Sequence, residues 1–479
     1  MNTRPHPPAP RLAWWNGDVH RLLNGLRRSL ASPSRNPRMA TVLGRLLGIA
    51  FIVCFGTGLY SHFLQDPLPW MVFPTRPTFL YQLSQGIHIT AGIACVPLIL
   101  GKLYVVFPEL FQTPPVRSFS HFLERASIAL FVAASLVEIT IGLLNTFQFY
   151  ALFPFPFKQT HFALSFVIIG SLAIHIAVKL DVIARYWRKN DSYDSDGNVI
   201  GFDDAPPATA SAPPSAASAA APAADSARVR VSAAPGDAGE PKRVLSAPAS
   251  ATDDAGGSQP ASATGVTGRL FAWIDATPEP SPTTSRRGFV ATIAVATAAV
   301  VAFTAGQSFR PLDGVNFFAP RKAGIGPNAL PVNRTASAAR VLESAVAPDW
   351  ALTVVNGDAS RSFTLAELAE LPQHDVDLPI ACVEGWSQNA SWRGPRLLDL
   401  LDTVGADAGV SIRATSLEEK GGFRLMDMGP EFVRDDLTLV ALEVNGQVLD
   451  IDHGYPARII APARPGVRQT KWLSMIEVI

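Results

Sequence analysis

The sequence predicts a multidomain protein with an all-α transmembrane four-helix bundle, a fifth signal-anchor helix and an α+β domain. Three observations predict this. Four long apolar stretches stand near the start, a low-complexity segment follows them, and the last part mixes strand and helix patterns. Each apolar stretch has about 20 residues, the length that a helix needs to cross the hydrocarbon core of a membrane. The net formal charge of the 479-residue chain is zero and it has no basic tract, which argues against nucleic-acid binding.

The four apolar stretches predict a membrane region over residues 41–189, after a cytoplasmic N-terminal segment of residues 1–40. Basic residues precede the first stretch, flank the second connection and follow the fourth stretch. By the positive-inside rule, both ends of this region are expected in the cytoplasm. The stretches cover residues 43–61, 86–107, 125–147 and 160–181.

Histidines are concentrated in this region, where five of the nine in the chain lie in or beside the apolar stretches. An ionisable side chain in a membrane helix is costly and usually functional. His161 and His175 share the fourth stretch, and a helix would place them about 40° apart on one face and about 21 Å apart along its axis. His88 begins the second stretch on the same outer side as His161. The candidate haem ligands are therefore His88, His161 and His175, with His62 at the outer end of the first stretch as an alternative.

Two runs in this region, YQLSQGIHITAGIACVPLILGKLYVVFPELF and HFLERASIALFVAASLVEITIGLLN, resemble the b-type cytochrome bundle of actinobacterial fusion proteins. The resemblance implies one or two haem b groups. Lys102 stands where a two-haem pattern would have a second histidine after His88, so both counts stay open. His121, on the inner side, is a further possible partner for His175. The alternative is that these histidines form hydrogen bonds between helices.

Residues 190–284 are rich in Ala, Pro, Ser and Gly. Such a composition cannot bury enough apolar surface to fold, which predicts a disordered cytoplasmic linker. Residues 285–307 then combine paired arginines, Arg286 and Arg287, with Phe289 and an Ala/Val-rich run. This segment resembles a twin-arginine export signal, and the alternative is an ordinary helix with a basic cytoplasmic flank. Both interpretations predict a fifth span that places the rest of the chain outside the plasma membrane, held there by an uncleaved anchor.

The last part of the chain, residues 330–479, predicts an α+β domain with a mixed sheet. Cys382 lies in the run LPIACVEGWSQNASW, where a strand-like segment opens into a polar turn. No cysteine follows it, and none precedes it after Cys95, so it has no disulfide partner in this domain. A lone thiol of this kind is either a small buried hydrophobe or a ligand. Strand-like runs cover 350–355, 378–383, 437–444 and 457–461, and helical patterns cover 364–370 and 396–403.

The run around Cys382 resembles the cysteine loop of the sulfite-oxidase superfamily. VNGQVLDIDHGYPARIIAP and GVRQTKWLSMIEV resemble the closing part of the same domain. The resemblance implies a molybdenum held by molybdopterin, with Cys382 as the one protein thiolate, a soft donor that suits this metal. Forked guanidinium groups and an ammonium group also suit the pterin phosphate. The residues that the resemblance places at the cofactor are Asn333, Cys382, Ser416, His453, Arg458, Arg468 and Lys471.

The resemblance implies oxygen-atom transfer outside the membrane, either reduction of S- or N-oxides or oxidation of sulfite. Electrons would pass through haem b to or from the quinone pool or another respiratory carrier. The twin-arginine export machinery, which carries folded cargo, would accommodate a domain loaded with cofactor in the cytoplasm. We expect no dimer of the sulfite-oxidase type, because the chain stops just after the KWL segment. Two other classes stay open: a membrane-anchored binding or assembly module without molybdenum, and a cytochrome devoted to quinone chemistry.

Overall fold

The computed structural model describes the membrane helices and the C-terminal domain. The predicted linker, residues 190–284, lies outside the described residues. The described residues are 19, 21–23, 25–26, 30, 32, 34–112, 116, 118–150, 153–187, 285–419 and 421–479.

Five described helices are long and apolar enough to cross a membrane, which confirms the prediction of five candidate spans. Polar caps extend some of them beyond the apolar runs. Asn36 caps the first helix by accepting a hydrogen bond from the Met39 amide at 2.9 Å, and Ser118 and Ser285 cap two others. The five helices are α2 (Pro37–Gln65), α3 (Leu80–Val106), α4 (Phe119–Thr146), α5 (Phe157–Tyr186) and α7 (Arg286–Ala305).

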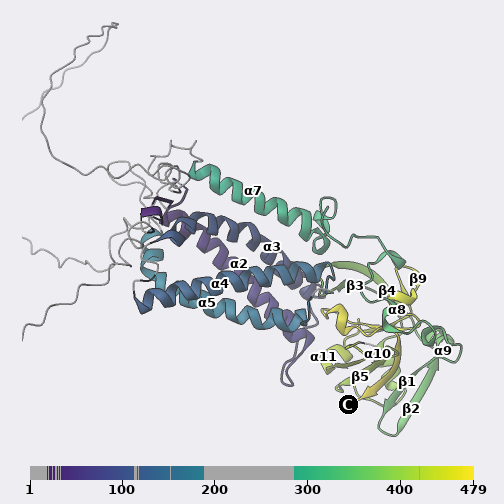
Figure 1. Cartoon of the computed structure of the whole chain (residues 1–479). Helices are drawn as coiled ribbons and strands as arrows, with labels where there is room; N and C mark the ends of the chain where they lie inside the picture. The colour runs from purple at the N-terminus through teal and green to yellow at the C-terminus, as the bar shows by residue number, and fades with distance from the viewer. Residues whose placement is uncertain are drawn as a thin grey trace, which may run out of the picture. The chain divides into compact units, whose positions relative to one another are not determined.

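The membrane helices pack in pairs, with α2 against α3 and α5, α4 against α5, and α7 against α3 (Figure 1). A buried apolar cluster of residues from α2, α3, α4 and α5 joins them, and Phe289, Val290 and Ile293 of α7 pack against it. Gly101 of α3 allows α7 to come close, because a Cβ at this position would lie 2.8 Å from Ile293 Cδ1.

The C-terminal domain contains three sheets. One has five strands in the order β2-β1-β11-β5-β6, one has four in the order β3-β4-β8-β9, and β10 pairs with β7. The five-stranded sheet is mixed, as predicted, because β1 is parallel to β11 and the other pairs are antiparallel. The strands are β1 (Ala351–Asn356), β2 (Ala359–Thr364), β3 (His374–Ala381), β4 (Ser387–Gly394), β5 (Ile412–Ser416), β6 (Leu425–Met428), β7 (Leu439–Ala441), β8 (Glu443–Val444), β9 (Gln447–Val448), β10 (Arg458–Ile460) and β11 (Leu473–Val478).

Short helices connect these strands, and two of them match the helical patterns expected at 364–370 and 396–403. The first of these two begins with a capping box, in which Thr364 and Glu367 satisfy each other's backbone amides. The α-helices are α8 (Ala336–Ala339), α9 (Leu365–Glu370), α10 (Leu397–Asp402) and α11 (Pro430–Val433). The 3₁₀ segments are η1 (Phe107–Phe111), η2 (Gly306–Ser308), η3 (Arg310–Leu312), η4 (Pro327–Ala329), η5 (Ser344–Val346), η6 (Ile451–His453) and η7 (Gly466–Arg468).

The main apolar core of the C-terminal domain extends into the ends of two membrane helices. Leu64 of α2 and Tyr81 of α3 belong to the same buried cluster as Leu352 and Ile476 of the five-stranded sheet. A second cluster, which contains Cys382 and Trp392, lies under the β3–β4 hairpin. The helix ends and the C-terminal domain therefore share one packed interior at this point.

Candidate functional site

Cys382 lies at the base of a short turn between β3 and β4, residues Cys382–Trp386, called here the cysteine loop. The two strands pair up to Ala381 and Ser387, so the loop is closed by the end of a regular hairpin. The Cys382 amide donates to the Trp386 carbonyl at 2.8 Å, and the Gly385 amide donates to the Cys382 carbonyl at 3.1 Å. Gly385 has a φ of 94°, a backbone conformation that glycine adopts without strain.

The Cys382 thiol is buried and faces polar groups. Its sulfur receives a hydrogen bond from Asn333 Nδ2, and the Glu384 amide lies 3.5 Å away. Trp386 Nε1 donates to Asn333 Oδ1 at 2.7 Å, which orients the amide so that its NH₂ group faces the sulfur. Burial raises the pKa of the Cys382 thiol, and the neighbouring Glu384 carboxylate raises it further. The sulfur can become a thiolate at neutral pH only when a bound cation compensates for burial.

Two cationic side chains, the buried Arg458 and the partly buried Lys471, lie against Gly454. Lys471 Nζ donates to the carbonyls of Arg334 and Asp452, at 2.6 and 2.7 Å. A Cβ on Gly454 would lie 3.1 Å from Lys471 Cβ and 3.2 Å from Arg458 Cβ, and the φ of 111° strains any other residue, so glycine is favoured here. Burial lowers the pKa of Lys471 to about 7 and that of Arg458 to about 9. An anion bound here would stabilise the charged form of both groups.

Arg458 is not fully satisfied by protein groups. Its Nη1 donates to the His453 carbonyl at 2.9 Å, whereas its buried Nε has no hydrogen-bond partner among the residues that the structure describes. A buried donor without a partner is costly and calls for an explanation, such as a missing ligand. The orphaned Nε, the close contact at Gly454 and the two cationic side chains together fit an anionic group.

Other residues expected at the cofactor hold this cluster in place. Ser416 Oγ donates to the Lys471 carbonyl at 2.7 Å and accepts from the Glu418 amide. His453 Nε2 lies 2.9 Å from the Pro327 carbonyl and 3.2 Å from that of Leu330. Burial, and then the charges of Arg458 and Lys471, lower the pKa of His453 to about 4, so its ring stays neutral.

Six of the seven residues expected at the cofactor thus fall into one connected network, and Arg468 does not join it. Arg468 Nη2 donates to the Asp427 carbonyl at 3.1 Å, beside Arg464, which donates to the same oxygen. The sequence interpretation did not select Arg334 or Trp386. Arg334 follows Asn333 directly and pairs with Glu418 at 2.7 Å, and Trp386 stands inside the recognised cysteine motif.

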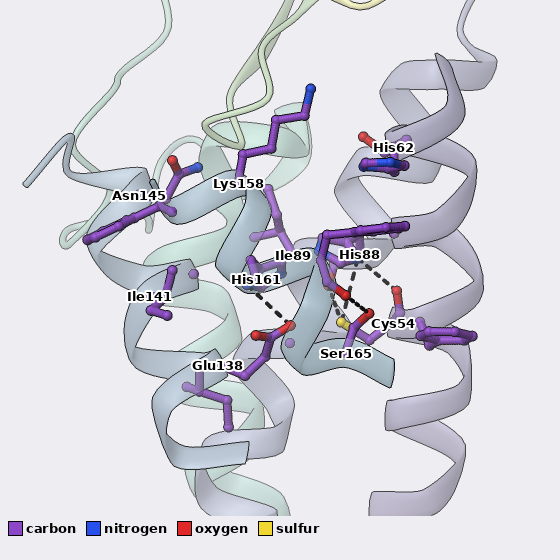
Figure 2. A pocket seen from close by; sticks show the side chains of 18 of the residues that line it. Cys54, His62, His88, Ile89, Glu138, Ile141, Asn145, Lys158, His161 and Ser165 are labelled. Carbon is purple, nitrogen blue, oxygen red and sulfur yellow. Dashed lines mark hydrogen bonds and ion pairs between the residues drawn. The ribbon is translucent and has the colours of Figure 1, made fainter. Parts of the chain in front are cut away.

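A second candidate site lies among the membrane helices. It is a cavity of about 250 Å³ lined by residues of α2, α3, α4 and α5 and by Val383 and Glu384 of the cysteine loop (Figure 2). The rings of His88 and His161 lie edge to face there, with centroids 6.0 Å apart and planes at 75°. His88 Nδ1 lies 2.8 Å from the Cys54 carbonyl, and His161 Nδ1 lies 3.3 Å from Glu138 Oε1. A ring held at Nδ1, as that of His88 is, can use Nε2 as a metal ligand, whereas His161 Nδ1 makes no hydrogen bond among the described residues.

The other two candidate haem ligands do not join this pair. His62 also lines the cavity, but its ring stacks on Phe162 with the centroids 3.6 Å apart. His175 lies beside Phe131 at 6.4 Å. Lys102, where a second histidine was sought, donates to the Ala40 carbonyl of α2. Within the described residues, no three His, Cys, Asp or Glu side chains form a group that would bind a metal ion.

Comparisons with known proteins find similar sequences for the C-terminal domain. Residues 339–479 match the family model "Oxidoreductase molybdopterin binding domain". Mouse mitochondrial sulfite oxidase is 29% identical over 154 residues, which cover 26% of this chain and 27% of that protein. For the Drosophila melanogaster enzyme, the identity is 31% over 159 residues, 27% of each chain. The chain therefore spans about a quarter of the length of these sulfite oxidases.

A further similar protein is the putative protein-methionine-sulfoxide reductase subunit YedZ1 of Azospira oryzae. It is 29% identical over 118 residues, which cover 25% of this chain and 44% of that protein. The five apolar helices indicate a membrane protein. The region that the family model matches contains Cys382, the two cationic side chains and Gly454, and Asn333 precedes it. The C-terminal part of this chain is thus a molybdopterin-binding oxidoreductase domain of the sulfite-oxidase superfamily.

Proposed function

We propose that the protein is a membrane-bound molybdopterin-dependent oxidoreductase that transfers an oxygen atom outside the membrane. The observation that carries this proposal is the buried Cys382 thiol, faced by the oriented Asn333 amide and connected to the two cationic side chains. The matched domain supports the cofactor. The same match supports an oxidoreductase over a binding or assembly module without molybdenum.

The residues present fit the molybdenum cofactor. When bound, the cofactor supplies the oxygen-atom transfer and the exchange of two electrons. Cys382 would bind the metal as a thiolate, and the Asn333 amide would stabilise the negative charge of the sulfur. Arg458 and Lys471 would bind the pterin and its phosphate. Ser416 holds the backbone of Lys471, and the neutral His453 ring keeps the backbone of the 327–330 segment in place.

The histidine pair His88–His161 fits one haem b. Two imidazole rings whose centroids lie 6.0 Å apart among the membrane helices would be able to hold one haem iron. The Cys54 carbonyl would fix the orientation of the His88 ring, and the Glu138 carboxylate lies 3.3 Å from His161 Nδ1. The separate positions of His62 and His175 favour one haem over two. When bound, this haem would pass single electrons between the quinone pool, or another respiratory carrier, and the outer domain.

We propose reduction of an S- or N-oxide as the reaction, with sulfite oxidation as the second candidate. A sulfite site would gather several arginines at the metal. Arg393, one candidate for that role, pairs instead with Asp375 at 2.7 Å on the exposed face of β4. Arg424, the other candidate, is exposed.

The proposed arrangement keeps the N-terminal segment and the linker in the cytoplasm and the C-terminal domain outside. The uncleaved α7 would be both the export signal and the membrane anchor of that domain. The boundaries are 1–40 for the N-terminal segment, 41–189 for the cytochrome-like membrane region, 190–284 for the linker, 285–307 for the anchor and 330–479 for the external domain.

The test uses the full chain, purified in detergent from a host that makes the molybdenum cofactor. Molybdenum is measured by elemental mass spectrometry and haem by the reduced-minus-oxidised spectrum, in the wild type, Cys382→Ser and His161→Ala. We expect near-stoichiometric molybdenum and a b-type spectrum in the wild type. Cys382→Ser should lose oxide reduction and keep haem, whereas His161→Ala should lose haem and keep molybdenum. A wild-type protein without molybdenum would contradict the proposal and favour a cofactor-free binding module.

A further inference from the structure

The cysteine loop is in direct contact with the helices that carry the histidine pair. The Val383 carbonyl accepts hydrogen bonds from Gln85 Nε2 of α3 at 3.3 Å and from Asn145 Nδ2 of α4 at 3.5 Å. Glu384 Oε1 accepts from Gln148 Nε2 at 2.7 Å. The residue after the thiol is thus bonded to two membrane helices.

Gln85 is held in one orientation by buried partners. Its side chain is 5% exposed, and its Oε1 accepts a hydrogen bond from Ser61 Oγ at 3.1 Å. Ser61 Oγ in turn lies 3.2 Å from Tyr81 Oη. Because the oxygen of the amide is engaged by α2, its NH₂ group faces the Val383 carbonyl. A buried polar network of this kind fixes a unique arrangement.

Other contacts keep the loop against the same place. Ser308 Oγ of η2, directly after α7, donates to the Gly385 carbonyl. Ile89 of α3 lies against Gly385 so closely that a side chain at 385 would collide with it. The loop is therefore held by α3, by α4 and by the end of α7.

Gln85 stands one helical turn before His88 on α3, and Val383 follows Cys382 directly. A continuous connection thus runs from the His88 ring through one turn of α3 and the Gln85 side chain to the Val383 carbonyl. The peptide bond then leads to Cys382. Covalent bonds and a single hydrogen bond of 3.3 Å make up this connection. Its two ends are His88, a proposed ligand of the haem, and Cys382, the proposed ligand of the molybdenum.

We propose that Gln85 is the residue that connects the histidine pair to Cys382 for electron transfer, and that its hydrogen bond to Val383 is the contact the electrons cross. This inference rests on the proposed function. For an S-oxide, two electrons cross one at a time and two protons come from the solvent. The S–O bond breaks, and the oxygen leaves as water.

The test compares Gln85→Met with Gln148→Met. Methionine approximates the length of glutamine and removes the amide, so each variant loses two hydrogen bonds. Gln85→Met loses those with Ser61 and the Val383 carbonyl, and Gln148→Met loses those with Glu384 and, at 3.3 Å, the Asn333 carbonyl. Only the first interrupts the connection to Val383. A purely structural role would affect both variants alike.

The measurement is stopped-flow reoxidation of reduced haem after addition of dimethyl sulfoxide. We expect Gln85→Met to slow reoxidation by about tenfold or more, because it removes the aligned contact between Gln85 and Val383. Gln148→Met should slow reoxidation by less than about threefold. Reduction of dimethyl sulfoxide by reduced viologen, which donates to the outer domain directly, should stay at the wild-type rate in both. The haem spectrum, its midpoint potential and the molybdenum content should also be unchanged.

Hydrogen–deuterium exchange of the peptide containing residues 382–386, in protein made without molybdenum, provides a readout that needs no turnover. We expect similar exchange in the two variants. Reoxidation in Gln85→Met within twofold of the wild type, or equal slowing in both variants, overturns the inference and leaves the proposed function intact. A wild-type haem that the oxide never reoxidises, in protein that contains molybdenum, contradicts the proposed function itself, and the inference fails with it.

Discussion

At the scale of single residues, the site around Cys382 buries ionisable groups more deeply than a domain without a ligand would need. Cys382 and Arg458 are buried and Lys471 is partly buried, and burial disfavours the charged form of all three. Under the proposed function, a metal would compensate the thiolate and a phosphate would compensate the two cations. The same groups that destabilise the empty site therefore stabilise the loaded one, so cofactor binding and folding stability are coupled.

His453 gives a prediction about acid stability. Its pKa falls from an ordinary value of 6.5 to about 4 in the folded state, first through burial and then through Arg458 and Lys471. Between these values the unfolded chain binds a proton that the folded chain does not. The free energy of unfolding therefore decreases as the pH falls through this window, by up to about 1.4 kcal/mol per pH unit.

We expect His453→Gln to show a smaller loss of stability between pH 6.5 and pH 4 than the wild type. The measurement is the midpoint of thermal unfolding as a function of pH, followed by tryptophan fluorescence. Near pH 8 the variant should be the less stable protein, because the contacts of Nε2 with Pro327 and Leu330 are altered. Parallel pH profiles for the two proteins would show that His453 is not the group responsible.

Candidate residues around Cys382 could be selected from the sequence where a short motif contains them. Their contacts could not be predicted where the contacting groups belong to distant segments. The cysteine motif led to Cys382, and the family match confirms a molybdopterin-binding domain around it. Nothing local indicated that His453 would face carbonyls at 327 and 330, more than a hundred positions earlier. The residues next to the histidine pair, Cys54 and Glu138, likewise come from other helices.

At the scale of elements, apolar length predicted the membrane helices well and strand signals predicted the sheets only in part. A run of about 20 apolar residues has few alternatives to a membrane helix. The expected strand 437–444 is wrong as a single element, because it divides into β7 and β8, which belong to different sheets. Its continuous apolar pattern did not reveal the change of partner. Polar strands such as β2, with one buried residue, gave little signal at all.

The packing of α7 on α3 gives the second prediction. A leucine at Gly101 would overlap Ile293, because even a Cβ there lies 2.8 Å from Ile293 Cδ1. Overpacking of this kind typically costs about 1–3 kcal/mol. We expect Gly101→Leu to lower the midpoint of thermal unfolding in detergent, and Ile293→Ala to restore part of the loss in the double variant.

Gly170→Leu is the matched control, because Gly170 is exposed and nothing lies within 4 Å of a Cβ there. It should leave the unfolding midpoint unchanged. If α7 were cleaved and lost after export, Gly101→Leu would be as stable as this control. The experiment therefore also tests whether α7 remains as a membrane anchor.

At the scale of the whole molecule, the contact between the membrane helices and the C-terminal domain combines an apolar interior with an ion pair whose arginine is exposed. Tyr81 and Leu64 are 1% and 4% exposed and belong to the core of the domain. Arg76, in the connection between α2 and α3, pairs with Asp435 at 2.5 Å, but its side chain is 47% exposed. No sequence pattern predicts such a contact, because each partner folds through its own local signals and only the tertiary packing brings them together.

These two kinds of contact should differ strongly in energy. Exposed ion pairs contribute about 0–1 kcal/mol, whereas truncating a large buried aromatic side chain costs about 3–5 kcal/mol. We expect Tyr81→Ala to lower the midpoint of thermal unfolding in detergent far more than Arg76→Ala does. Tyr81→Phe, which keeps the ring and loses only the hydroxyl contact with Ser61, should lie close to the wild type.

Salt separates the two contributions further. Raising the salt concentration to about 1 M shortens the screening length to about 3 Å. The unfolding midpoints of the wild type and Arg76→Ala should then become equal, whereas the midpoint of Tyr81→Ala should stay lower. Hydrogen exchange of the peptide with residues 382–386 should increase in Tyr81→Ala, because Tyr81 orders Ser61 and through it Gln85. If Arg76→Ala were the more damaging change at both salt concentrations, the contact would be electrostatic and the shared apolar core would not hold the cysteine loop against the membrane helices.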